Sequence, residues 1–229
     1  MSTSASANVK ILDYHMGNMF SVESACREVG LNAAITSDNA EIAKADALIL
    51  PGVGAFAEAM KNLQRLDLIN PLKDFVQSGR PFLGICLGMQ LLFTESEEFG
   101  ITRGLDIVSG QVKRFPSHTQ RNDLLRVPHI GWSSITRSDD PRAPRWEESV
   151  LRDSKDGDNM YFVHSYYVVP SDAGIVLSNT DYEGVRFCSS IHRRNIQAMQ
   201  FHPEKSAQQG IQLYRAWKDI ITTFKENAT

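Results

Sequence analysis

Cys86 is the residue in this sequence whose surroundings most favour chemistry. It stands between Gly84 and Gly88, after the apolar segment 81–83 and before the apolar segment 91–93. This pattern predicts a short strand that turns sharply into a helix, with the cysteine at the corner. Glycines let neighbouring chain come close to such a corner, where a nucleophile is held in strained backbone. Free N–H groups at the helix start favour a thiolate. Cys86 is therefore a candidate nucleophile, and the alternative is an ordinary buried cysteine.

A reactive cysteine needs a base, and the base needs a group that fixes its tautomer. His202 follows an apolar segment and precedes Pro203, which favours extended or turn backbone before it. In extended chain, residues two apart point to the same side, so the carboxylate of Glu204 is expected beside the His202 imidazole. Alone, this pair also fits a surface histidine beside an exposed glutamate. Together with Cys86, it predicts a nucleophile, base and orienting group for acyl transfer.

A second candidate loop, residues 51–56, follows the uninterrupted apolar segment 47–50, which is typical of a strand buried on both faces. Ligands of open α/β folds bind at the carboxyl edge of the sheet, where this loop is expected. Gly52 and Gly54 would let backbone N–H groups turn toward a developing oxyanion, although such a pair is also common in plain turns. The third glycine of a dinucleotide-binding fingerprint is absent.

Composition narrows the function classes. The chain has 229 residues, 42% of them hydrophobic, and a formal charge of −3, which leaves no broad basic surface for nucleic acid. Three cysteines without CxxC spacing predict neither a disulfide framework nor a zinc site, and fit a reducing cytoplasm. Residues 1–8 are expected to be a disordered tail rather than a signal peptide, and residues 9–227 a single domain. The sequence has no apolar run long enough to span a membrane.

Alternating strand and helix patterns in the first 90 residues predict a parallel sheet covered by helices on both sides. In the first helix, Phe20, Val22, Ala25, Cys26 and Val29 fall near helical spacing and are expected to face the core, with Gly30 as the stop. Strands are predicted at 9–12, 33–36 and 47–50, with a further short strand that begins at the apolar segment 81–83 and ends at the Cys86 corner, and further helices are predicted near 41–43 and over 57–66 and 68–77.

The second half of the chain has a different character. The patterns predict an exposed connection with at most one short helix over 138–158, and an apolar-faced final helix over 207–224. Cys188 alternates with its neighbours in a strand and is interpreted as structural. The remaining predictions are a hairpin over 106–115, a loop with an aromatic tip at 127–132, one strand over 160–169, and a hairpin formed by 185–191 and 196–201.

The segments 84–90 (GICLGMQ) and 200–206 (QFHPEKS) together resemble the class I, or triad-type, glutamine amidotransferases. Segments 13–18, 51–56, 127–132 and 161–166 are similar to the subgroup that works as the glutaminase partner of a (β/α)₈-barrel cyclase. The resemblance runs from Val9 to the final helix. It implies a flavodoxin-like α/β fold, with an open, largely parallel sheet flanked by helices and an added antiparallel hairpin region.

The resemblance also implies roles for individual residues. Cys86 would attack the carboxamide of L-glutamine, His202 would act as base and then acid, and Glu204 would orient it. The N–H of Leu87, with that of Val53 after a local peptide rearrangement, would form the oxyanion hole. No cofactor or metal is implied. Further residues are expected to bind glutamine (Gly52, Gln90, Ser165, Tyr166) or to face the cyclase (Asn18, Trp132, Lys205).

Two residues depart from the subgroup's pattern: His15 stands where glycine is common, and Ser133 where asparagine is common. Both lie in segments expected to face the partner, so they leave its identity open. A related subgroup that supplies ammonia for amidino-sugar formation is one alternative. A stand-alone cysteine hydrolase is a second, and a non-catalytic regulatory module is a third, against which the intact Cys86, His202 and Glu204 argue.

Overall fold

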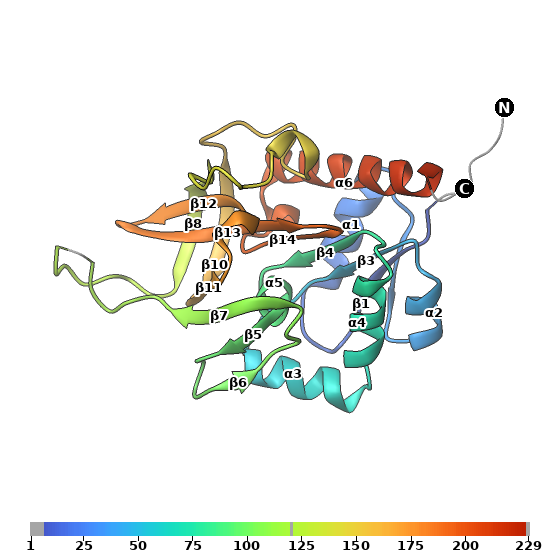
Figure 1. Ribbon diagram of the computed structural model, residues 1–229, viewed down its shortest axis with the longest axis horizontal. Helices are drawn as coiled ribbons and strands as arrows, with labels where there is room; N and C mark the ends of the chain where they lie inside the picture. Colours follow the sequence, from blue (N-terminus) through green and yellow to red (C-terminus); the bar gives the residue numbers. More distant parts are fainter. Residues whose placement is uncertain (1–6, 120, 228–229) are drawn as a thin grey trace.

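The computed structural model describes residues 7–119 and 121–227 (Figure 1). Most of the predicted N-terminal tail, residues 1–6, therefore lies outside the described residues. At Asn8 the chain already contacts the body of the protein, because its backbone N–H donates to Asp46 Oδ2 at 2.7 Å. Within the described ranges, no helix is long and apolar enough to cross a membrane.

The centre of the fold is an eight-stranded sheet, and it confirms the predicted α/β class. Parallel pairing joins neighbours in the order β2, β1, β3, β4, β14, and the sheet continues through three antiparallel strands, β13, β12 and β9. The predicted hairpin formed by 185–191 and 196–201 is confirmed as β13 and β14. The strands are β1 (Val9–Leu12), β2 (Ala33–Thr36), β3 (Ala47–Leu50), β4 (Phe82–Ile85), β9 (Thr136–Arg137), β12 (Val176–Tyr182), β13 (Val185–Arg193) and β14 (Ile196–Met199).

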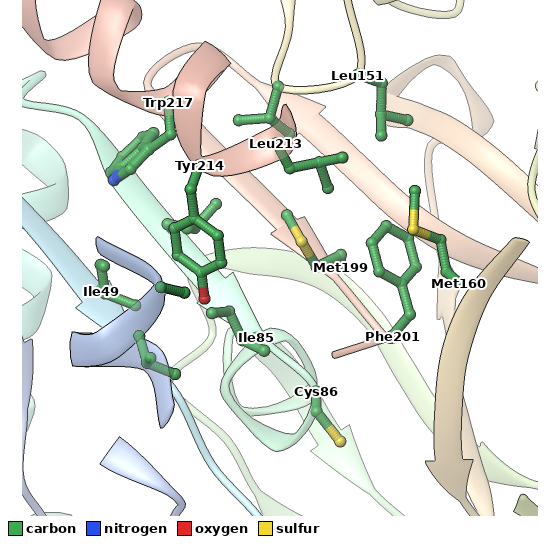
Figure 2. Packing of buried hydrophobic residues seen from close by; sticks show 14 of the residues in the cluster. Ile49, Ile85, Cys86, Leu151, Met160, Met199, Phe201, Leu213, Tyr214 and Trp217 are labelled. Atoms are coloured by element: carbon green, nitrogen blue, oxygen red, sulfur yellow. The ribbon is translucent and has the colours of Figure 1, made fainter. Parts of the chain in front are cut away.

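Helices cover both faces of the parallel strands (Figure 1). Ile49 and Ile85 pack with residues of α1 (Met19–Glu28) and α6 (Ala207–Asn227), as Figure 2 shows for Tyr214 and Trp217. Their neighbours Leu48 and Leu50 point to the other face, against α2 (Asn39–Lys44), α3 (Phe56–Arg65) and α4 (Ile69–Gln77). The continuous apolar strand 47–50 is therefore buried on both sides, as its sequence predicts.

Two smaller sheets stand beside the central one. One has the order β11-β7-β5-β6 and the other pairs β10 with β8. Together with α5, they surround the carboxyl edge of the parallel strands. Their bounds are β5 (Phe93–Ser96), β6 (Thr102–Arg103), β7 (Val108–Arg114), β8 (His129–Ser134), β10 (Asn159–His164), β11 (Tyr166–Pro170) and α5 (Leu87–Leu91), with the short 3₁₀ helices η1 (Trp146–Glu148), η2 (Ala173–Ile175) and η3 (Pro203–Lys205).

The hairpin predicted over 106–115 is wrong, because this segment is the single strand β7. Gly110 is responsible: its φ is +146°, and a side chain there would lie 2.5 Å from the carbonyl oxygen of Val169 on β11. The glycine serves close approach between strands rather than a turn.

The single strand predicted over 160–169 is also wrong, because the chain divides at Ser165. β10 pairs with β8, whereas β11 pairs with β7. The segment predicted as a loop at 127–132 is strand from His129 onward, and only its first two residues lie outside β8.

The prediction for Phe20 is wrong as well, since this side chain is 74% exposed. At about 100° per residue it lies about 200° around the helix from Val22, on the opposite side. The connection 138–158 contains one short helix, η1, as predicted, but it is not wholly exposed. Trp146 is buried there and donates its indole N–H to the carbonyl of Leu177 at 2.7 Å.

Candidate active site

Cys86 occupies the predicted corner between β4 and α5. Its φ of +54° and ψ of −112° lie in a region that side-chain-bearing residues rarely adopt, and its N–H donates to the Met199 carbonyl at 2.8 Å. The two glycines serve close approach. A Cβ on Gly88 would lie 1.8 Å from the Leu50 carbonyl oxygen, and one on Gly84 would lie 3.0 Å from Ala198 Cβ.

The side chain of Cys86 belongs both to the core and to a cavity. It is 5% exposed, and Figure 2 shows its sulfur pointing away from the apolar cluster. Cys86 also lines a cavity of about 260 Å³. Cys26 and Cys188 are buried and free, and burial, aided by Glu23, raises the pKa of the Cys26 thiol to about 12. Their predicted structural role fits these surroundings.

The predicted pair of His202 and Glu204 is present. Nδ1 of His202 lies 2.7 Å from Oε1 of Glu204, and both side chains are only 2% exposed. Burial by itself lowers the pKa of His202, but the neighbouring Cys86 and Glu204 outweigh it and raise the pKa to about 10. Nε2 of His202 has no hydrogen-bond partner in the described ranges and is free to meet a reacting group.

Local hydrogen bonds hold this histidine in place. The His202 N–H donates to the carbonyl of Tyr161 at 2.9 Å, and the Ser206 hydroxyl donates to the His202 carbonyl at 2.6 Å. Ser206 Oγ in turn accepts from the Tyr161 N–H at 3.0 Å. Glu204 lies in the 3₁₀ helix η3 rather than in extended chain, so the predicted pairing is confirmed although the backbone that creates it is a turn.

The loop after β3 lies against the first turn of α5. The Leu87 N–H donates to the Gly52 carbonyl at 3.3 Å, so this N–H already has an acceptor. In a trans peptide the N–H points opposite to the carbonyl, and the Val53 N–H is therefore turned away from Leu87. Tyr14 anchors the loop, because its buried hydroxyl donates to the Pro51 carbonyl at 2.8 Å. Burial raises the pKa of the Tyr14 phenol well above its usual value, so the hydroxyl stays protonated and donates this hydrogen bond.

Most residues expected to bind glutamine line the same cavity as Cys86. Gln90, Ser165 and Tyr166 are among its lining, together with Val53 and Leu87, whereas Gly52 is not. A Cβ on Gly52 would lie 2.1 Å from the Tyr14 hydroxyl, so this glycine packs against the loop's anchor instead. Gln90 donates both amide N–H groups, to the Tyr166 carbonyl and to Gln200 Oε1, each at 2.9 Å. Both donors of this amide are therefore in use within the protein.

Two of the three residues expected to face a partner meet at one ring. The Trp132 side chain is 52% exposed and packs edge-on against Tyr161 at 5.9 Å between ring centroids. Lys205 Nζ lies 6.0 Å above the same ring. Asn18 has a local role, in which its side-chain oxygen caps α1 by accepting from the Ser21 N–H at 3.3 Å.

Two groups of buried polar residues next to the cavity were not singled out by the sequence reasoning. Gln200 is fully buried and lies between Gln90 and Cys86. The alternation that pairs His202 with Glu204 would also have placed Gln200 on that side of the chain. His129 and His164 form a buried pair behind Tyr166. In the part of the chain that the structure describes, no group of three or more histidine, cysteine or acidic residues could hold a metal ion.

A cysteine at a strained strand-to-helix corner, beside a buried histidine–glutamate pair on an open α/β sheet, defines the triad type of site. The family model of glutamine amidotransferase class-I matches residues 10–216. The chain therefore belongs to the class I glutamine amidotransferase family.

Its relatives point to one group within that family. The chain is 47% identical to the imidazole glycerol phosphate synthase subunit HisH of Syntrophotalea carbinolica, over 93% of this chain and 100% of the relative. It is 45% identical to the protein of the same name from Aquifex aeolicus, over 91% and 94% of the two chains. Among solved structures, a putative GMP synthase component from Thermoplasma acidophilum matches with a TM-score of 0.69 at 17% identity, covering 97% and 98%, which shows the shared fold.

Proposed function

We propose that this chain is the glutaminase subunit of an imidazole glycerol phosphate synthase, which hydrolyses L-glutamine to glutamate and ammonia. The observation that carries the proposal is the buried contact between His202 and Glu204 beside the strained corner of Cys86. The names of the relatives support the histidine pathway over the amidino-sugar alternative, and the word subunit in those names argues against a stand-alone hydrolase.

In the proposed reaction, the Cys86 thiolate attacks the carboxamide carbon of glutamine. His202, held protonated by its raised pKa, gives its proton to the departing nitrogen, which leaves as ammonia. The resulting γ-glutamyl thioester is attacked by water, which His202 deprotonates, and the thiolate leaves with glutamate as product. Glu204 stabilises the imidazolium and fixes Nδ1 as the donor toward itself.

The negative charge that develops on the carbonyl oxygen needs N–H donors. We assign them to Leu87 and Val53. Leu87 donates to the Gly52 carbonyl in this structure, so rotation of the Gly52–Val53 peptide would both release the Leu87 N–H and turn the Val53 N–H toward the substrate. The glutamine itself would contact Gln90, Ser165 and Tyr166 in the cavity of about 260 Å³, with Gly52 shaping the loop above it.

The ammonia is proposed to pass to a cyclase subunit with a (β/α)₈ barrel, which forms imidazole glycerol phosphate. Its docking surface would include Trp132, Lys205 and Asn18, with Tyr161 added because its ring contacts the first two of these. The exposed fraction of Trp132 supports this assignment, since a large half-exposed aromatic side chain is typical of an interface anchor.

The proposal is tested by glutamate release from glutamine, for wild type and Cys86→Ala, each alone and with the barrel cyclase and its substrate. We expect slow hydrolysis by the isolated wild type, strong acceleration in the loaded complex, and no activity above background for Cys86→Ala in either state. Equal activity of the two proteins would refute the nucleophile assignment. Full activity of the isolated subunit would refute the dependence on a partner and restore the stand-alone hydrolase.

A further inference from the structure

Gln200 places an amide against the sulfur of the proposed nucleophile. Its Nε2 lies 3.6 Å from Cys86 Sγ, within the range for a hydrogen bond to sulfur, and the side chain is fully buried. A buried amide that turned a carbonyl oxygen toward a thiolate would repel it, so the direction of this amide matters for the chemistry.

The direction of the Gln200 amide follows from a backbone carbonyl. The Tyr166 carbonyl can only accept, so the Gln90 group 2.9 Å away must be its NH₂. The same NH₂ lies 2.9 Å from Gln200, which must present its oxygen there. The other end of the Gln200 amide, its NH₂, then faces Cys86. Turning Gln200 over would set two NH₂ groups against each other and its oxygen against the sulfur.

The Tyr166 carbonyl, which determines the direction of both amides, is itself held in place. The Tyr166 carbonyl also accepts from His164 Nδ1 at 2.8 Å, and His164 Nε2 lies 3.1 Å from His129 Nδ1. Burial lowers the pKa of His164 to about 3 and that of His129 to about 4, so both rings are neutral near pH 7. Each neutral ring has one donor and one acceptor. Because His164 Nδ1 donates to the Tyr166 carbonyl, His164 Nε2 accepts from His129 Nδ1. His129 Nε2 then accepts from the Ser133 hydroxyl at 2.9 Å.

We propose that Gln200 is a further catalytic residue, which donates an N–H to the Cys86 sulfur and stabilises its thiolate form. This inference rests on the proposed glutaminase function. The thiolate exists twice in that reaction, before it attacks glutamine and again when the thioester breaks. A hydrogen bond to an ionised group is stronger than one between neutral groups, so the contact favours both of these states over the thiol.

The test uses Gln200→Met, which keeps the length of the side chain and removes its donor, and Gln200→Glu, which keeps its shape and polarity. Gln197→Met is the matched control. Gln197 is a second buried glutamine, in β14 three residues before Gln200, but its amide oxygen accepts from the Val150 N–H at 2.6 Å, away from the sulfur. All variants are assayed in complex with the barrel cyclase and its substrate.

We expect kcat for glutamine to fall about 10- to 100-fold in both Gln200 variants, as loss of one charge-assisted hydrogen bond implies, with KM within about twofold. Alkylation of Cys86 by iodoacetamide, followed by mass spectrometry in the folded subunit, should slow about tenfold. A residue that only supported the structure would leave alkylation unchanged or speed it by loosening the site. The control should unfold at a lower temperature and keep its kcat within about twofold.

The inference is overturned if folded Gln200→Met keeps kcat and alkylation within twofold of wild type. If that variant does not fold, the same two measurements on Gln200→Glu decide. Failure of the inference is distinguishable from failure of the proposed function. In the first case Cys86→Ala is inactive while the Gln200 variants remain active, and in the second Cys86→Ala keeps wild-type activity.

Discussion

The carboxylate of Glu204 offers the sharpest test of the triad, because Glu204→Gln removes its charge and keeps its shape. The side chain is 2% exposed and contacts His202 Nδ1 at 2.7 Å. Replacing a charge-assisted hydrogen bond by a neutral one costs roughly 1–1.5 kcal/mol. The lost attraction to the imidazolium adds to this, and is bounded by about 4 kcal/mol for unit charges about 4 Å apart in a protein environment.

We therefore expect kcat for glutamine to fall about 100-fold, equivalent to about 2.7 kcal/mol, with little change in KM. The assay is steady-state glutamate release by the complex with the barrel cyclase and its substrate. Glu41→Gln serves as the control, since this glutamate is half-exposed and pairs with Lys10 rather than with a residue of the proposed site. A kcat within threefold of wild type would refute the role of Glu204.

The same variant has a defined effect on stability. Cys86 and Glu204 raise the pKa of His202 in the folded state from 6.5 to about 10, against the opposing effect of burial. A group with a raised folded pKa contributes stability that is complete below the unfolded pKa and is lost as pH rises through the folded pKa. Urea titrations should therefore show the largest difference between wild type and Glu204→Gln near pH 6.5, and a shrinking difference toward pH 10. A difference that grew with pH would contradict this linkage.

Two further predictions concern packing and the partner surface. Gly88→Ala should lower the free energy of unfolding, measured in urea, by more than about 3 kcal/mol and abolish glutaminase activity, because its Cβ would lie 1.8 Å from the Leu50 carbonyl oxygen. Gly174→Ala is the control. Its Cβ would meet only flexible side chains, at 3.1 Å or more, so it should lower the free energy of unfolding by less than about 1 kcal/mol. Trp132→Ala should raise the dissociation constant for the barrel cyclase at least tenfold without lowering the melting temperature. Phe99→Ala, at a 90% exposed position, is the control and should change neither quantity. Equal binding by both variants in calorimetry would show that Trp132 is not part of the interface.

Features set by neighbouring residues could be predicted from the sequence. The corner at Cys86 and the parallel strands before it follow from glycine spacing and apolar runs, and each was found where expected. The pairing of His202 with Glu204 is also local, because only Pro203 stands between them and its ring limits the backbone there.

Features that depend on residues far apart in the chain could not be predicted from the sequence. The segment 160–169 contains a continuous strand pattern, but its two halves pair with different strands, β8 and β7, and the chain must divide between them. Glycine is common in turns, and from the sequence alone Gly110 is therefore interpreted as part of one. Its structural role depends instead on the close approach of Val169, which lies far along the chain. The orientation of the Gly52–Val53 peptide belongs to this class too, since it depends on Tyr14 and Leu87 at once.

In this structure the proposed nucleophile and base are in place, whereas the proposed oxyanion donors are not. The His202 imidazole contacts the Glu204 carboxylate, and Cys86 is close enough to raise the pKa of that imidazole, while the Leu87 N–H is bound to the Gly52 carbonyl. Tyr14 fixes Pro51, so the smallest change that would complete the proposed oxyanion hole is rotation of the single peptide that follows Gly52. Tyr161 lies at the proposed docking surface, and its carbonyl accepts the N–H of His202. A partner that packs on this ring would therefore bear directly on the residue that holds the proposed catalytic base, His202.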